Sequence, residues 1–185
     1  MKIAHYFLQG EVDHSGLPQW LAEHTGLYGD DPDVGKLVIW INSGGGDVLA
    51  AIEAINLMKS SDIPVVTVIN GAAESAALLI AASGHIRLAY QNSWGMAHHF
   101  STSAEGSYHD IADMVKHNEL LHDAMVGILE SGSGLMEDEV EDMLLSRGSR
   151  WYGAKQLQEL GLIDEVIEDH KQLKKMLGTT KIGFN

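Results

Sequence analysis

The sequence lacks cysteine, is poor in basic residues and contains no long apolar run. Without cysteine the chain forms no disulfide, no thiolate zinc site and no cysteine nucleophile. The sequence has only 12 Lys and Arg but 26 Asp and Glu. The resulting net charge of -14 argues against binding nucleic acid or an anionic membrane through bulk electrostatics. No apolar run reaches the roughly 18 residues of a membrane span, and the first residues lack a signal-peptide pattern, so we expect a cytoplasmic protein.

The order of apolar and polar segments predicts an α/β fold. The 185 residues suit one domain, 1–185, which is long enough to bury about 70% of its unfolded surface. Strand and helix patterns alternate at short spacing, which is typical of parallel βαβ units with right-handed crossovers. We expect strands at 3–8, 37–41, 65–69, 86–90, 94–99 and 162–167, and helices at 18–25, 48–59, 108–130, 137–145, 151–160 and from 170.

Glycine and aspartate mark the expected connections. Gly10 should end the first strand, and residues 26–36 should form a polar loop. Residues 42–47 should form a glycine loop that ends at Asp47, a good N-cap for the following helix. The chain from 178 onwards should be a loose end.

The helix expected at 108–130 is long for so small a domain. Its residues at three-and-four spacing form a largely apolar stripe, so we expect it to project and to pack against a neighbouring subunit. Without such a partner it would expose apolar side chains. The side chains expected to be exposed in this way are Met114, Met125 and Leu129. The whole stripe comprises Ile111, Met114, Val115, Asn118, His122, Met125 and Leu129.

The stretch 65–83 carries the strongest candidate for chemistry. It predicts a buried strand, a tight turn at Gly71 and a helix whose first turn holds Ser75. A serine on such an elbow is exposed at the carboxyl end of the strand, beside free N–H groups of the helix. The neighbouring alanines also have a simpler structural interpretation, since small residues let any helix pack closely on a sheet.

A nucleophilic serine needs a base and a set of oxyanion donors. Histidines His98 and His99, and the glycine loop 44–46, fall at the same carboxyl ends of the expected strands, where α/β folds place their sites. Each also has a simpler interpretation, as a surface histidine or a tight turn. The loop lacks the Lys and Ser or Thr of a phosphate-binding loop, and we predict no metal site and no cofactor.

Four separated blocks of the sequence resemble the ClpP serine peptidases. INSGGGDVLAA (41–51) is similar to the family's INSPGG oxyanion loop, and VINGAAESAALLIAASG (68–84) is similar to its GMAAS nucleophile elbow. NSWGMAHH (92–99) is similar to the histidine strand, and WYGAKQLQELGLIDEV (151–166) to the F-x-S-A-x-E-A…GLID tail. FLQGEVD (7–13) also looks like the family's FLTGQV opening. The resemblance implies the ClpP/crotonase-like βαβ superhelix, with the helix at 108–130 as its projecting handle.

The resemblance implies a role for each matched residue. Ser75 would be the nucleophile and His98 the general base, with the adjacent His99 as the weaker candidate. The backbone N–H groups of Gly45 and Ala76 would form the oxyanion hole. Gly44 and Gly46 would contact the substrate.

The resemblance also implies an assembly. Members of the family form rings of six or seven subunits, often doubled through the handle, around a chamber that admits unfolded polypeptide. We therefore expect a homo-oligomeric ring. The chain begins close to its first strand and lacks the propeptide and most of the axial segment with which the family engages an unfoldase ATPase, which counts against such a partner.

The chain departs from the family at two places in the site. Ser149 occupies the place of the triad aspartate, and a hydroxyl can accept the imidazole N–H but cannot stabilise the imidazolium by charge. In a serine protease with a complete triad, loss of the acid slows turnover about 10⁴-fold. Asp142 or Glu74 could substitute for it, although Glu74 neighbours Ser75 and should point away from His98. The elbow also reads GAAES in place of GMAAS.

Three hypotheses follow. The first is an endopeptidase of the ClpP type acting through Ser75 and His98, slowed by Ser149. The second is a ring-forming relative that has lost catalysis and serves as an assembly or regulatory subunit. The third, an acyl-CoA hydratase or isomerase of the same superfold, would leave Ser75 beside His98 unexplained. Short, cysteine-free relatives also occur among phage head-maturation proteases, so a host or a phage origin stays open.

Overall fold

The computed structural model describes residues 2–25 and 33–178, and in this part of the chain seven strands form one sheet. The order is β1-β2-β3-β4-β7, with β5 beside β3 and β6 beside β5. All neighbouring strands run parallel except β5 and β6, which are antiparallel. The strands are β1 (Lys2–Val12), β2 (Val34–Gly46), β3 (Val65–Glu74), β4 (Ile86–Tyr90), β5 (Trp94–Ala97), β6 (Arg150–Gly153) and β7 (Glu165–Ile167).

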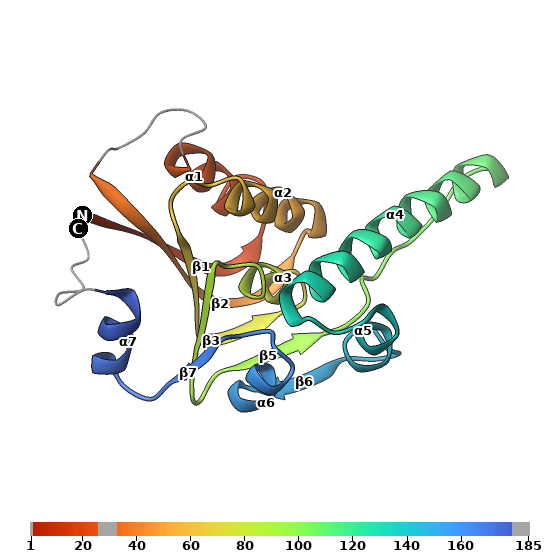
Figure 1. Ribbon diagram of the computed structural model, residues 1–185. Coiled ribbons are helices and arrows are strands. Elements are labelled where there is room, and N and C mark those ends of the chain that lie inside the picture. Colours follow the sequence, from red (N-terminus) through yellow and green to blue (C-terminus); the bar gives the residue numbers. More distant parts are fainter. Residues whose placement is uncertain (1, 26–32, 179–185) are drawn as a thin grey trace.

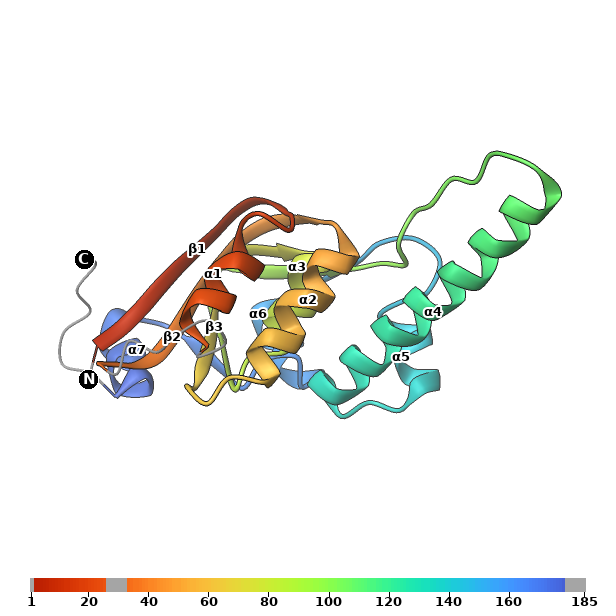
Figure 2. The same ribbon diagram turned by 90° about the horizontal axis from the view of Figure 1, so that it is seen from above.

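Helices cover the sheet on both faces (Figures 1 and 2). The run LVIWI in β2 is apolar throughout because alternate side chains enter two separate cores. Leu37, Ile39 and Ile41 lie in the larger core with the helices α1 to α6, whereas Val38 and Trp40 pack in a smaller core with α7. The helices are α1 (Leu17–His24), α2 (Val48–Lys59), α3 (Ala76–Ala81), α4 (Tyr108–Ser133), α5 (Glu137–Met143), α6 (Ala154–Glu159) and α7 (His170–Leu177).

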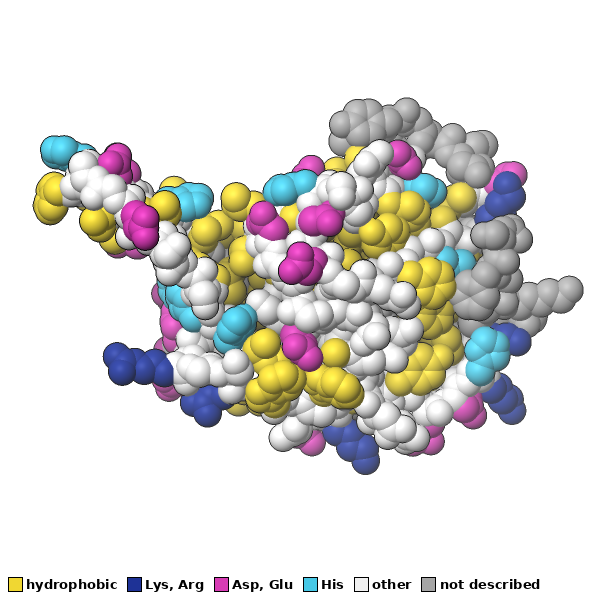
Figure 3. Space-filling model, turned by 180° about the vertical axis from the view of Figure 1, so that it is seen from behind, with side chains coloured by type: hydrophobic (Ala, Val, Ile, Leu, Met, Phe, Trp, Pro, Cys, Tyr) yellow, Lys and Arg dark blue, Asp and Glu magenta, His cyan; other side chains and the backbone are white. Residues whose placement is uncertain are grey.

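Helix α4 projects from the body as an arm, as Figures 1 and 2 show. It begins at a capping box, in which Ser107 and Asp110 satisfy each other's backbone N–H groups, and it ends at Gly134 with φ of 76°. The arm carries hydrophobic side chains on its surface (Figure 3, left). Its exposed apolar residues are Tyr108, Ile111, Val115 and Leu120.

The expectation that Met125 and Leu129 would be exposed was wrong. Both side chains are buried within the chain, at 4% and 1% exposure, because the last turns of α4 pack on the main core. Met114 is half-buried and lines a cavity. The solvent-exposed apolar surface of the arm therefore lies nearer its free end than the stripe predicted.

Three strands run further than their apolar cores predicted. β1 passes Gly10 and reaches Val12, with a register shift between Gln9 and Glu11. β2 continues through the expected glycine loop, where Glu11 pairs with Gly45 and Val12 with Gly46. Polar and glycine residues can extend a strand when a neighbouring strand supplies its hydrogen bonds, which a hydrophobic pattern alone does not reveal.

The turn expected at Gly71 was also wrong, because β3 continues to Glu74. The Asn42 side chain explains the glycine: a Cβ at Gly71 would lie 2.3 Å from Asn42 Oδ1, and the same oxygen accepts the Ala72 N–H at 3.0 Å. The strand ends only at Glu74, and Ser75 separates it from α3.

Near the C-terminus the first residues of the helix expected at 151–160 form strand β6, which pairs with β5 and is followed by α6. β5 and β7 are shorter than expected. α4 is three residues longer at its C-terminal end than the expected 108–130. Most of the loop expected at 26–36, and the chain end after 178, lie outside the described residues.

Candidate active site

Ser75 occupies a strained backbone position between β3 and α3. Its φ of 52° and ψ of -125° make it the one described non-glycine residue with positive φ. A β-carbon makes this region unfavourable, so the surrounding structure must hold it. The Ser75 N–H donates to Met96 O at 2.8 Å, and the Leu78 N–H donates to Ser75 O at 2.9 Å. The strand and the helix thus fix the elbow from both sides.

His98 lies against this serine. β5 pairs with the end of β3, with Glu74 opposite Met96, so the residue two positions after Met96 comes beside the elbow. The Ser75 Oγ and His98 Nε2 atoms are 2.8 Å apart, and both side chains are half-buried. The hydroxyl can donate to Nε2 when the imidazole proton is on Nδ1, which prepares the serine for deprotonation.

No carboxylate supports His98 among the described residues, where its single hydrogen-bond partner is Ser75. Ser149 is exposed and lines, with His98, a cavity of about 340 Å³, but no hydrogen bond joins the two. Glu74 points to a different group, since its Oε1 accepts the Trp94 Nε1–H at 3.2 Å. Asp142 is exposed on α5 and does not line the cavity around His98.

The end of β2 packs directly against the elbow. At Gly45, with φ of 93°, a Cβ would lie 2.6 Å from Glu74 O and 2.8 Å from Ser75 Cβ, so only glycine permits this approach. The Gly45 N–H donates to Ser43 Oγ at 3.1 Å. Ala76 is the first residue of α3, and helix N–H groups in the first turn have no partner within their own helix.

Ser75 and His98 open into a cavity of about 500 Å³. One wall comes from Gly46 and the first turn of α2, and the opposite wall comes from α4, with Met114 and Leu121. Gly44 and Gly45 do not line this cavity. Of the three glycines named from the sequence, Gly46 alone faces the space beside the serine.

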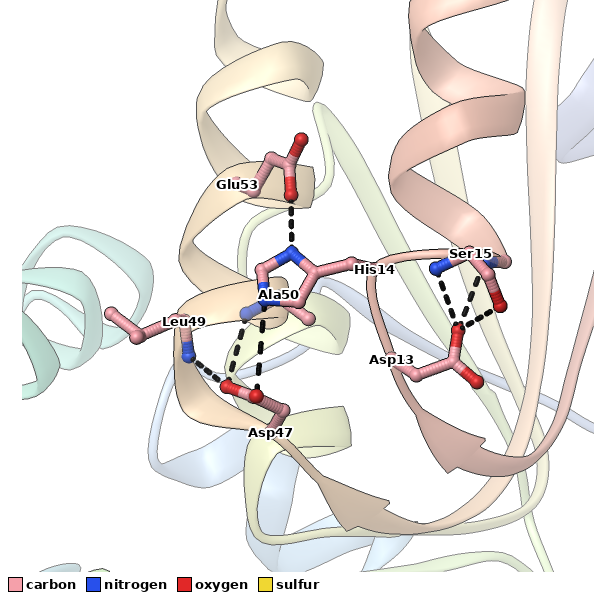
Figure 4. A network of polar contacts seen from close by, with 8 residues as sticks. Asp13, His14, Ser15, Asp47, Leu49, Ala50 and Glu53 are labelled. Carbon is pink, nitrogen blue, oxygen red and sulfur yellow. Dashed lines mark hydrogen bonds and ion pairs between the residues drawn. The ribbon is translucent and has the colours of Figure 1, made fainter.

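A polar network of side chains lies at the N-terminal end of α2, next to this wall of the cavity (Figure 4). Asp47 caps the helix by accepting from Leu49 N at 2.7 Å and Ala50 N at 3.3 Å. His14 lies between two carboxylates, with Nδ1 2.6 Å from Glu53 Oε2 and Nε2 3.8 Å from Asp47 Oδ2. The hydrogen bond to Glu53, followed by the charges of the nearby carboxylates, raises the pKa of His14.

A second set of histidines lies on the other side of His98. His99 does not reach the serine, because its Nε2 lies 2.9 Å from His122 Nδ1. His122 in turn places Nε2 2.7 Å from Glu141 Oε1 on α5. The sequence pattern assigned His122 to an apolar stripe, and it did not indicate Glu141 as a candidate site residue. The clue would have been a polar residue at a stripe position on the predicted inner face of α4.

A strained serine, hydrogen-bonded to a histidine beside helix N–H groups, is an arrangement that serine hydrolases use for acyl transfer. No helix in the described residues is long and apolar enough to span a membrane. The same residues include no cluster of three His, Asp or Glu side chains placed to bind a metal ion.

Comparison with known proteins identifies the family. A family model described as Clp protease matches residues 1–170. The ATP-dependent Clp protease proteolytic subunit 3 of Rhodococcus jostii (strain RHA1) is 28% identical over 179 residues, 96% of this chain and 87% of that protein. The ATP-dependent Clp protease proteolytic subunit of Bacteroides fragilis is 33% identical over 144 residues, 76% of this chain and 69% of that protein.

The chain therefore belongs to the Clp protease family. The resemblance inferred from the sequence blocks is confirmed, as is the mixed α/β fold with a parallel sheet. The family and its named proteolytic subunits support a serine peptidase, that is, a hydrolase.

Proposed function

We propose that the chain, acting as one peptidase domain, is a serine endopeptidase of the ClpP type that cleaves unfolded polypeptides or peptides. The observation that carries this proposal is the 2.8 Å contact between Ser75 Oγ and His98 Nε2 on a strained elbow. Ser75 attacks the scissile carbonyl while His98 takes the hydroxyl proton. His98 then gives the proton to the leaving amine, and water hydrolyses the acyl-enzyme by the same route.

The tetrahedral intermediate requires hydrogen-bond donors for its oxyanion. We assign this role to the backbone N–H groups of Ala76 and Gly45. Ala76 is supported by its place at the start of α3, directly after the nucleophile. Gly45 must exchange its bond to Ser43 Oγ for one to the oxyanion. Gly44 and Gly46 then contact the substrate backbone, and Gly46 already faces the cavity.

Ser149 takes the place of the triad acid in this mechanism. Its hydroxyl can accept the Nδ1–H of His98 if the two side chains approach each other across the cavity that both residues line. This bond would select the correct tautomer without stabilising the imidazolium by charge, so turnover should be slow. A catalytically inactive assembly or regulatory subunit is the alternative function, and it is favoured by the lack of a carboxylate beside His98 in the described residues.

The peptidase would work as a homo-oligomeric ring of six or seven subunits, single or doubled, that encloses the active sites. Two observations support self-association: the family consists of ring-forming peptidases, and the projecting arm exposes Tyr108, Ile111, Val115 and Leu120. Light scattering at micromolar concentration should give the mass of a ring. A monomeric mass would contradict this part of the proposal.

A fluorophosphonate probe tests the function, because it reacts only with an activated serine. The intact protein should be labelled, and Ser75→Ala should abolish the labelling and lower peptide hydrolysis by about 10²-fold, which is the part of the roughly 10⁶-fold triad effect that remains without the acid. The matched control is Ser83→Ala, since Ser83 lies after α3 and, within residues 2–25 and 33–178, bonds only to helix carbonyls. It should label like the wild type. Absence of labelling in the intact oligomer would favour the inactive subunit.

A further inference from the structure

A chain of three side chains links the arm to the residue that follows His98. Glu141 Oε1 lies 2.7 Å from His122 Nε2, and His122 Nδ1 lies 2.9 Å from His99 Nε2. The rings of His99 and His122 also stack, with centroids 5.0 Å apart and planes inclined by 16°. The chain therefore joins α5, α4 and the segment after β5 by side-chain contacts alone.

The order of donors and acceptors along this chain follows for neutral imidazoles with the His99 proton on Nε2. A carboxylate can only accept, so His122 donates its Nε2–H to Glu141. In this tautomer Nδ1 of His122 accepts and His99 donates its Nε2–H, which leaves the unprotonated Nδ1 of His99 3.3 Å from Phe100 O. Each imidazole is thus held in one orientation by two kinds of contact, a hydrogen bond and a ring stack.

This arrangement restricts the position of His98. Adjacent Cα atoms across a trans peptide are about 3.8 Å apart, so fixing His99 limits where His98 can lie. In a complete triad a carboxylate would hold the far side of the base. Here His98 has no second hydrogen-bond partner among the described residues, and its orientation depends on its backbone and on packing.

We propose that His122 and Glu141 are positioning residues, which hold His99 and thereby keep His98 aimed at Ser75 in the absence of a triad acid. This inference rests on the proposed peptidase function. It assigns no contact with substrate to the three residues. They act through the backbone of the base, so their loss should lower the turnover number and leave substrate affinity nearly unchanged.

Four variants of the intact protein test the proposal. His122→Phe keeps the stacked ring and removes both hydrogen bonds. His99→Leu removes the donor to His122, whereas His99→Gln keeps an N–H donor near the position of Nε2. His109→Phe is the matched control, because His109 is exposed near the free end of α4. The measurements are the rate of fluorophosphonate labelling, kcat and KM for a peptide, and the unfolding temperature.

We expect His122→Phe and His99→Leu to lower the labelling rate and kcat by about ten- to a hundredfold, with KM changed less than about twofold. His99→Gln should recover most of the loss, and His109→Phe should behave as the wild type. Wild-type labelling in His122→Phe and His99→Leu, or equal losses in His99→Leu and His99→Gln, would overturn the inference alone. A wild-type protein without Ser75 labelling would overturn the proposed function and this inference with it.

Discussion

The two flanks of the catalytic cavity are held by different means. The glycine flank, residues 43–47 with the elbow at Ser75, is held by backbone geometry: strand pairing, positive φ angles and close approach without side chains. The histidine flank, residues 98–100 with the facing parts of α4 and α5, is held by side chains. His122 and Glu141 keep 29% and 39% of their side-chain surface exposed.

This difference predicts how each flank responds to substitution. A backbone-held flank cannot absorb an added β-carbon, so a change there alters the fold and the catalytic geometry together. A flank held by partly exposed side chains can lose its contacts without unfolding, because exposed hydrogen bonds contribute little net stability. Activity and stability should therefore change together on the glycine flank and separately on the histidine flank.

Gly45→Ala should give the largest effect of this comparison. The new Cβ would lie 2.6 Å from Glu74 O and 2.8 Å from Ser75 Cβ, at a φ of 93°. The backbone strain alone is about 1 to 2 kcal/mol, and displacement of the elbow should lower fluorophosphonate labelling by at least about 100-fold. Chemical denaturation and labelling kinetics measure the two effects.

Gly44→Ala is the control, since a Cβ there meets no atom within 4 Å and the residue is in the same strand. It should keep its stability and its rate of labelling by the small fluorophosphonate probe, whereas KM for a peptide can change because Gly44 is proposed to contact the substrate. Equal behaviour of the two variants would show that the elbow is not held by the close approach of β2.

Ser149→Asp should strengthen the histidine flank by supplying a charge behind His98. If Ser149 occupies the place of the triad acid, the carboxylate can accept the Nδ1–H and stabilise the imidazolium. We expect kcat to rise at least about tenfold, below the roughly 10⁴-fold difference that the acid makes in a complete triad. Ser146→Asp adds the same charge to the same cavity but next to Arg150, whose Nε–H Ser146 accepts at 2.7 Å.

Steady-state kinetics on both variants decide this point. A rise in Ser149→Asp alone supports the assignment of Ser149. A rise in both variants would indicate a general effect of negative charge, and no rise in either would remove Ser149 from the mechanism.

The difference between the flanks also explains what the sequence could predict. The elbow, the glycine run and the strand before His98 each encode their geometry within a few neighbouring residues. Local patterns therefore pointed to Ser75, to the pair His98 and His99 and to the loop 44–46, and the resemblance to the ClpP peptidases selected His98 and Gly45 among them. Strand ends were harder, because β2 and β3 continue through polar residues only where their neighbours pair with them. Gly71 illustrates this, since its requirement for glycine comes from Asn42 on the adjacent strand.

The histidine chain could not be predicted in the same way. His99, His122 and Glu141 are distant in the sequence, and they meet only because α4 and α5 fold back to the segment that follows β5. Met125 and Leu129 were assigned to an outer surface for a related reason. A helical stripe shows which residues share a face, but not how far along the helix the core extends.

His14→Gln should give the smallest effect and tests whether side chains contribute to the glycine flank at all. The hydrogen bond to Glu53, with the charges of Asp47, Glu53 and Asp13, raises the pKa of His14 in the folded protein. A raised folded-state pKa means that the stabilisation is complete below the unfolded value of about 6.5 and is lost as the pH rises through the folded value. The unfolding temperature of His14→Gln should therefore fall below that of the wild type in mild acid and match it in alkali.

The double variant His14→Gln, Glu53→Gln measures how much of the stabilisation by His14 comes from its contact with Glu53. Since Glu53 contributes most to the raised pKa of His14, removing both side chains should lower the unfolding temperature in mild acid only slightly more than Glu53→Gln alone, by the contribution of Asp47 and Asp13. The side chains of this network are half exposed, which limits the size of the effect. A difference that stays constant from about pH 5.5 to 9 would show that the charge of His14 contributes nothing, and no difference at any pH would show that the glycine flank is held by its backbone alone.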